Sequence, residues 1–155
     1  MMLYLVQHGE AQREEVDPAR PLSGKGRADV RKVALFAAGA GVRVERLFHS
    51  CKLRARETAD IMGEVLGPVA GSAETDGLAP LDDPAIWAEQ LQAMTAATML
   101  VGHLPHLQRL AGLLLCGTAE KQGVAFAMGG IVALERDEAG NWSLRWMVIP
   151  DLVRP

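Results

Sequence analysis

The N-terminal segment Leu3-Tyr4-Leu5-Val6-Gln7-His8-Gly9 is a short apolar run that ends in a polar residue, a histidine and a glycine. Consecutive apolar residues that favour β structure predict a buried strand over residues 3–6. In a mostly parallel sheet, ligands bind beyond the carboxyl ends of the strands. The segment therefore predicts that His8 lies at a sheet edge where a ligand can reach it.

Strands and helices alternate along the rest of the chain. Apolar residues at helical spacing predict helices that begin near residues 23, 50–53, 83 and 107. Short β-forming runs predict strands over residues 44–48, 98–101, 130–135 and 142–148. The alternation predicts an α/β fold, with a mostly parallel mixed sheet and helices on both faces. Since no repeat, low-complexity block or linker interrupts the pattern, we expect one domain over residues 1–155.

The composition narrows the class of protein. The chain has 155 residues, of which 49% are hydrophobic, and a formal net charge of −3. This excludes a disordered chain and argues against general nucleic-acid binding. The N-terminus has no basic leader region, and no apolar stretch approaches the roughly 20 residues of a membrane helix. With only two cysteines, a disulfide scaffold is not expected. We expect a cytoplasmic protein that does not contact membranes, and the short chain suits a monomer.

Four residues capable of phosphate chemistry follow predicted strands or precede predicted helices. His8 follows the first strand, His103 follows the strand over 98–101, and Arg54 lies in the first turn of a helix. Arg20 precedes the first long helix. A neutral imidazole is a good nucleophile toward phosphorus, and guanidinium groups match phosphate oxygens. Gly9 would let the backbone approach a ligand closely. These residue types at one sheet edge predict phosphoryl transfer.

Four segments occur in an order that resembles the histidine phosphatase superfamily. They are Leu5-Val6-Gln7-His8-Gly9-Glu10, Arg20-Pro21-Leu22-Ser23-Gly24-Lys25-Gly26, Ser50-Cys51-Lys52-Leu53-Arg54-Ala55-Arg56-Glu57-Thr58-Ala59 and Val101-Gly102-His103. The short chain and the Arg-Pro-Leu segment are similar to the SixA-type phosphohistidine phosphatase branch. The resemblance implies a phosphoglycerate mutase-like three-layer sandwich.

The resemblance also implies a role for each site residue. His8 would be the nucleophile that is transiently phosphorylated, and Arg54 would bind phosphate oxygens. His103 would donate to the phosphoryl group. Arg20 would be an additional phosphate ligand, and Gln7 and Gly9 would also contact the phosphate. No metal and no organic cofactor is implied.

The sequence departs from the family pattern at three places. Gln7 stands where the family has arginine, Cys51 stands where it has proline, and no acidic residue in the middle segment matches a proton donor. Replacing a charged donor by a neutral amide removes roughly 1–2 kcal/mol of phosphate stabilisation. A loss of that size slows a reaction by about one order of magnitude. We therefore expect Gln7 to weaken catalysis rather than abolish it.

Several alternatives stay open. His49 and His106 are interpreted as residues outside the site, and the His103/His106 pair lacks a third ligand for a metal. The chain could hydrolyse phosphohistidine on a protein such as a histidine-phosphotransfer domain, or a small phosphoramidate or phosphomonoester. It could also be a phosphate-recognising module that Gln7 has left without turnover. A small-molecule phosphatase or mutase is a third alternative.

Overall fold

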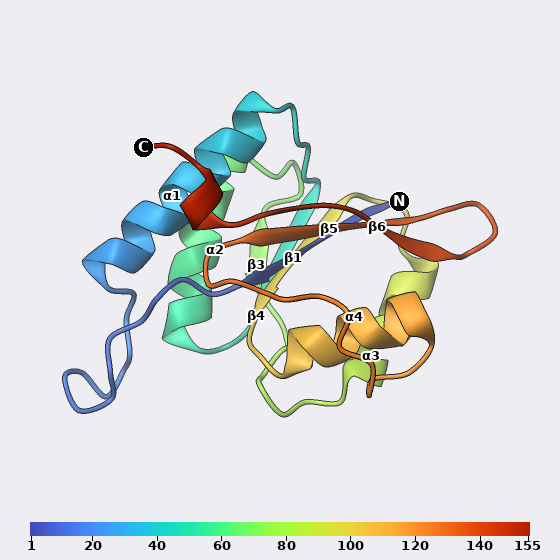
Figure 1. Cartoon of the computed structure of the whole chain (residues 1–155), viewed down its shortest axis with the longest axis horizontal. Coiled ribbons are helices and arrows are strands. Elements are labelled where there is room, and N and C mark those ends of the chain that lie inside the picture. The colour runs from blue at the N-terminus through green and yellow to red at the C-terminus, as the bar shows by residue number, and fades with distance from the viewer.

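The computed structural model describes residues 1–155 and contains one six-stranded sheet in the order β3-β2-β4-β1-β5-β6 (Figure 1). The strands are β1 Met2–Gln7, β2 Arg46–His49, β3 Ser72–Glu74, β4 Thr98–Gly102, β5 Ile131–Arg136 and β6 Trp142–Val148. The helices are α1 Gly24–Gly39, α2 Leu53–Leu66, α3 Pro84–Ala93 and α4 His106–Cys116, with a 3₁₀ turn η1 Pro150–Leu152. Strands β1 to β4 pair in parallel, whereas β5 and β6 pair antiparallel. The predicted mixed α/β sheet is confirmed.

Helices cover both faces of this sheet, as Figure 1 shows. On one face α1 and α2 pack against each other, and on the other α3 packs against α4. Each face has its own apolar core. The first core joins Val33 and Met62 of the helices to Val6 of β1, and the second joins Trp87 and Leu107 to Leu5. The three-layer arrangement is therefore present.

Local sequence explains most of the helix ends. The Ser23 hydroxyl caps α1 by accepting from the Gly26 N–H, and Asp83 caps α3 in the same manner ahead of Pro84. Gly67 ends α2 in the left-handed conformation that glycine adopts without strain. Cys116 is the last residue of α4 and is exposed.

The register of β1 and β4 places the two candidate histidines side by side. Gln7 at the end of β1 pairs with Gly102 at the end of β4. The residues that follow these two strand ends are His8 and His103. Side chains alternate between the two faces of a strand. Since Val6 and Val101 face the core under α1 and α2, His8 and His103 leave the sheet on that same side.

None of the helices has the length and apolar character needed to cross a membrane.

Candidate active site

His8 is held in one tautomer by the backbone carbonyl of the residue that follows it. The main-chain N–H of His8 donates to the Gly102 carbonyl of β4 over 3.0 Å, which fixes the residue at the strand end. Its Nδ1 lies 2.8 Å from the Gly9 carbonyl oxygen. Because a carbonyl oxygen can only accept, the proton of the neutral ring resides on Nδ1. The Nε2 atom is then the bare nitrogen, as a nucleophile requires.

The pKa of His8 is lowered by its surroundings. Burial is the largest cause, and the positive charges of Arg54 and Arg20 lower it further, while the hydrogen bond with Gly9 acts in the opposite direction. A lowered pKa keeps the ring neutral to a lower pH than that of a free histidine. The environment therefore favours the nucleophilic form at neutral pH.

His103 lies against His8, with ring centroids 5.1 Å apart. The residue is only 1% exposed. The Nε2 atom is 2.7 Å from the Ser50 hydroxyl, whereas Nδ1 is buried and has no protein partner. Burial, followed by the neighbouring charges at His8 and Arg54, lowers the pKa of His103 to about 3. The ring is therefore neutral at physiological pH and has one free polar atom.

Arg54 and Arg20 bring two positive charges to the histidines. Arg54 lies in the first turn of α2, and its Nε atom is buried without a partner. The Arg20 Nε donates to the Gln12 carbonyl over 3.1 Å, which orients its guanidinium. Neither side chain forms an ion pair with a carboxylate. Two unpaired guanidinium groups beside a helix N-terminus form a site suited to an anion.

The conformation of Arg20 is unusual. Its φ of 51° makes it the sole residue other than glycine in the left-handed region. For a side chain other than glycine this conformation costs roughly 1–3 kcal/mol. The surrounding loop supports it, since the Arg20 N–H donates to the Asp17 carbonyl at 3.0 Å. Such strain is common where a loop must present one side chain to a site.

The structure changes the interpretation of Gly9. Its N–H donates to the Thr58 hydroxyl over 2.9 Å, and Thr58 in turn donates to the Arg54 carbonyl over 2.7 Å. A Cβ atom at Gly9 would lie 2.7 Å from Val30 Cγ2 of α1. The close approach predicted for Gly9 is therefore to a helix, and its N–H is not free for phosphate. Thr58 joins the loop after His8 to the turn that carries Arg54.

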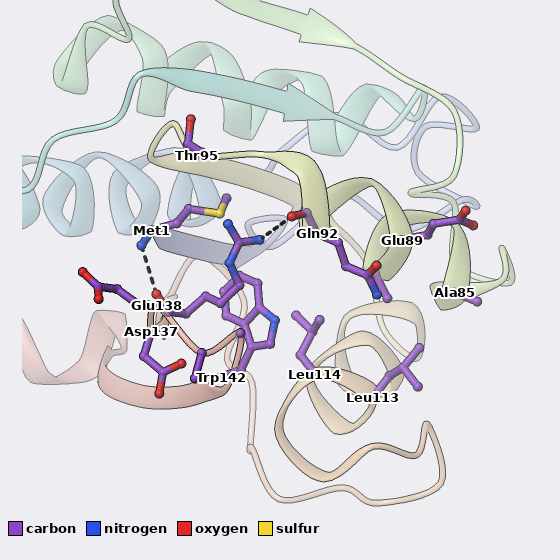
Figure 2. Close-up of a pocket in the computed structure, with 14 residues that line it drawn as sticks. Met1, Ala85, Glu89, Gln92, Thr95, Leu113, Leu114, Asp137, Glu138 and Trp142 are labelled. Atoms are coloured by element: carbon purple, nitrogen blue, oxygen red, sulfur yellow. Dashed lines mark hydrogen bonds between the residues drawn. The ribbon is translucent and has the colours of Figure 1, made fainter.

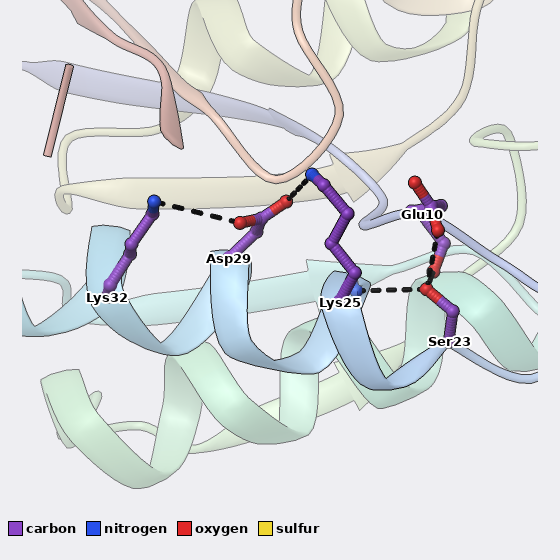
Figure 3. A network of polar contacts seen from close by, with 6 residues as sticks. Glu10, Ser23, Lys25, Asp29 and Lys32 are labelled. Carbon is purple, nitrogen blue, oxygen red and sulfur yellow. Dashed lines mark hydrogen bonds and ion pairs between the residues drawn. The ribbon is translucent and has the colours of Figure 1, made fainter. Parts of the chain in front are cut away.

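The residue after Gly9 is also fixed to α1, as Figure 3 shows. The Glu10 carboxylate accepts from the Ser23 hydroxyl over 2.9 Å, and the same hydroxyl caps the helix. Further along α1, Asp29 pairs with Lys25 at 2.5 Å and with Lys32 at 3.8 Å. Ion pairs of this kind near the surface add little stability. The contacts of Glu10 with Ser23 hold the His8 loop in place together with the hydrogen bond from Gly9 to Thr58.

Gln7 forms no side-chain hydrogen bond with the other candidate residues. Its carbonyl accepts from the Gly129 N–H over 2.9 Å, so the backbone holds the end of β1 on both sides. By strand alternation its side chain leaves the sheet on the side opposite to His8. Contact between Gln7 and a phosphate stays a prediction.

The two histidines predicted to lie outside the site, His49 and His106, do not complete a set of metal ligands. His49 is buried, and its Nδ1 is 2.9 Å from the Ser50 carbonyl. His106 is fully buried, and neither of its ring nitrogens has a partner. Burial lowers the pKa of His106, partly offset by Asp82. No group of three or more His, Cys, Asp or Glu residues is close enough to hold a metal ion.

The sequence alone indicates no role for Ser50 or Thr58, although both lie in the segment around Arg54. Both residues are buried, at 1% and 0% exposure, and both hydroxyls bond to groups far away in the sequence. A buried hydroxyl needs a partner. Their positions in a site motif were the available signal, but their partners become visible only in three dimensions.

A large groove lies away from these residues. A groove of about 1050 Å³ lies at the opposite end of β1, between α3, α4 and the β5–β6 turn (Figure 2). Arg136 is one of the residues that line it, and its guanidinium donates to the Met94 carbonyl over 2.6 Å and lies 5.6 Å from the Trp142 ring centroid. The groove contains none of the predicted phosphate ligands.

The fold and the cationic site together define a phosphate-handling enzyme with a phosphoglycerate mutase-like fold. Residues 3–80 match the model of the family described as the histidine phosphatase superfamily (branch 1). The chain belongs to this superfamily, in its SixA-like branch, and is a hydrolase of that type.

Individual relatives agree with this assignment. Phosphohistidine phosphatase SixA of Escherichia coli (strain K12) is 28% identical over 155 residues, which cover 97% of this chain and 94% of the relative. An uncharacterized protein of Picosynechococcus sp. is 36% identical over 125 residues, covering 76% and 74%. The solved structure of the protein histidine phosphatase SixA complexed with tungstate has a TM-score of 0.88 at 27% identity, covering 98% of this chain and 99% of that one.

Proposed function

We propose that this protein hydrolyses phosphohistidine, or a related phosphoramidate or phosphomonoester, through a covalent intermediate on His8. The observation that carries the proposal is the Nδ1 contact of His8 with the Gly9 carbonyl, at 2.8 Å. This contact leaves Nε2 unprotonated beside two guanidinium groups that have no carboxylate partner. A bare imidazole nitrogen next to an anion site is the arrangement that nucleophilic phosphoryl transfer needs.

The reaction would proceed in two displacements. In the first, the His8 Nε2 forms a bond to phosphorus while the bond from phosphorus to the leaving nitrogen or oxygen breaks. In the second, a water oxygen bonds to phosphorus, the bond to Nε2 breaks, and the water proton is released. Inorganic phosphate and neutral His8 are the products of this step. Charge on the phosphoryl oxygens would be stabilised by Arg54 and Arg20, and His103 would donate its N–H.

The absence of an obvious acid favours a leaving group that needs little protonation. No carboxylate lies among the groups that shift the pKa of His8 or His103. The imidazole of a phosphohistidine is itself basic, so it leaves more easily than an alkoxide. The relative from Escherichia coli is a phosphohistidine phosphatase by name. A phosphorylated protein, such as a histidine-phosphotransfer domain, is therefore the proposed substrate.

The remaining expectations belong to the same proposal. The oxyanion tungstate in the SixA structure supports a tetrahedral anion as ligand. We propose that residues 1–155 act as one domain, as a monomer, and in the cytoplasm, where the two free cysteines would stay reduced. Gln7 is the reason to retain a phosphate-recognising module without turnover as the second candidate.

The test is phosphate release from a phosphohistidine protein and from a generic aryl phosphate, with His8→Ala as the control. Release that vanishes in His8→Ala, together with a phosphorylated species trapped by rapid quenching at His8, supports the enzyme. Faster release from the phosphohistidine protein supports the proposed substrate class. No release from either compound, with vanadate still raising the melting temperature, supports the recognition module instead.

A further inference from the structure

The Ser50 hydroxyl connects the end of β2, the start of α2 and His103. Ser50 is 1% exposed, and its N–H donates to the Val101 carbonyl of β4 over 3.1 Å. Its Oγ atom accepts from the Lys52 N–H at 3.2 Å and lies 2.7 Å from the Nε2 atom of His103. The backbone thus fixes the hydroxyl, and the hydroxyl contacts the imidazole at short range.

The hydroxyl has a single proton, so its contacts restrict the tautomer of His103. Lys52 supplies a donor, and that contact uses one of the oxygen lone pairs. The sole remaining partner in reach of the hydroxyl proton is Nε2 of His103, because Ser50 Oγ makes no other hydrogen bond. If Ser50 donates to Nε2, the proton of the neutral ring must reside on Nδ1.

The tautomer of His103 decides whether its second ring nitrogen, Nδ1, carries a proton. Nδ1 is buried and has no protein partner, although buried polar atoms are rarely left without one. The His103 ring lies against the His8 ring, with centroids 5.1 Å apart, next to the proposed position of the phosphoryl group. A protonated Nδ1 would donate to a phosphoryl oxygen, whereas a bare Nδ1 would repel it.

We propose that Ser50 is a positioning residue that holds neutral His103 as the Nδ1–H tautomer, so that the ring presents a hydrogen-bond donor to the phosphoryl group. The inference rests on the proposed function of His8 as phosphate acceptor. Ser50 acts through His103 and does not touch the phosphoryl group. In this arrangement, His103 stabilises negative charge without carrying a positive charge of its own.

The first experiment identifies the tautomer directly. In the full-length ¹⁵N-labelled protein, long-range ¹H–¹⁵N correlation spectra at pH 7.5 distinguish protonated from bare ring nitrogens. We expect one His103 form, protonated at Nδ1, in the wild type and in Ser50→Thr, which retains the hydroxyl. Ser50→Ala should show a mixture with the Nε2–H form. A wild type protonated at Nε2, or an Nδ1–H form unchanged in Ser50→Ala, would overturn the proposal.

The second experiment separates positioning from a general structural role. An asparagine at position 103 places an amide where the ring carries Nδ1, and that amide can donate without help from Ser50. We expect Ser50→Ala to lower both kcat and tungstate affinity roughly 10- to 100-fold in the wild type but less than threefold in His103→Asn. Equal losses in the two backgrounds would show that Ser50 acts only through the fold and would refute the inference.

The same measurements distinguish failure of the proposed function from failure of this inference. If the wild type releases no phosphate, but Ser50→Ala still changes the tautomer and weakens tungstate binding, the hydrolase proposal fails and the role of Ser50 stands. If phosphate release is rapid and depends on His8, but is unchanged in Ser50→Ala, the hydrolase stands and the role of Ser50 is refuted.

Discussion

Acid should destabilise this protein through the neutral imidazole of His103. The pKa of this residue falls from 6.5 to about 3 in the folded state, chiefly because the ring is buried. Between these values the unfolded chain binds a proton that the folded chain does not. Stability that is present above pH 6.5 is therefore lost as the pH falls.

The size of the loss follows from the two pKa values. At pH 7.5 both states are essentially deprotonated, so the contribution of His103 is close to zero. At pH 5.0 the unfolded imidazole is almost fully protonated while the folded one is not, which amounts to about 2 kcal/mol at 1.36 kcal/mol per pH unit. His8 and His106 act in the same direction, since burial lowers the pKa of each. A variant that lacks the imidazole is therefore needed to separate the contribution of His103 from those of His8 and His106.

The assay is urea unfolding at pH 7.5 and 5.0 for the wild type and for His103→Asn, in buffers free of phosphate. Phosphate must be absent because an anion that binds the folded state raises its apparent stability. We expect the wild type to lose about 2 kcal/mol more than the variant between the two pH values. Equal losses in both proteins would mean that His103 is protonated in the folded state, and would refute the neutral imidazole.

Three further predictions concern the loop around His8. Gln7→Arg should raise kcat about tenfold, because a charged donor replaces a neutral one; near-zero turnover that stays unchanged would count against a weakened enzyme. The acid limb of the kcat/KM profile should lie below pH 6.5, since burial and nearby arginines lower the pKa of His8; a limb above 6.5 would contradict the neutral nucleophile. Gly9→Ala should lose roughly 1–3 kcal/mol of unfolding free energy because its Cβ would meet Val30 at 2.7 Å, whereas Gly24→Ala, with nothing within 4 Å, should not. Similar urea midpoints for these two variants would remove the packing argument.

The positions of His8, Arg54 and His103 could be predicted because each depends on local pattern. A short apolar run ends before His8 and another before His103, and a parallel sheet brings such ends to one edge. Arg54 follows a strand by a few residues and so falls in the first helical turn. The strand over 44–48 was predicted to begin two residues too early and to end one residue too early, since β2 runs over Arg46–His49.

The contacts that orient these residues could not be predicted in the same way. Ser50 reaches His103 across 53 residues, and Thr58 reaches Gly9 across 49. The local sequence around Ser50 and Thr58 does not distinguish them from serine and threonine residues that cap a helix or face solvent. The left-handed backbone of Arg20 is equally hidden, because that region is ordinarily taken by glycine or asparagine.

The cationic character of the site depends on where two nearby carboxylates point. Glu10 lies one residue after Gly9, and Glu57 lies in the same turn of α2 as Arg54, so either could neutralise a guanidinium. Instead Glu57 accepts from the Leu22 N–H over 2.8 Å and pairs with Arg27, and Glu10 accepts from the Ser23 hydroxyl. The same bonds that anchor the loops keep both acids away from the arginines. A chain with net charge −3 thereby retains an anion site, because its acidic groups close to the site are bonded elsewhere.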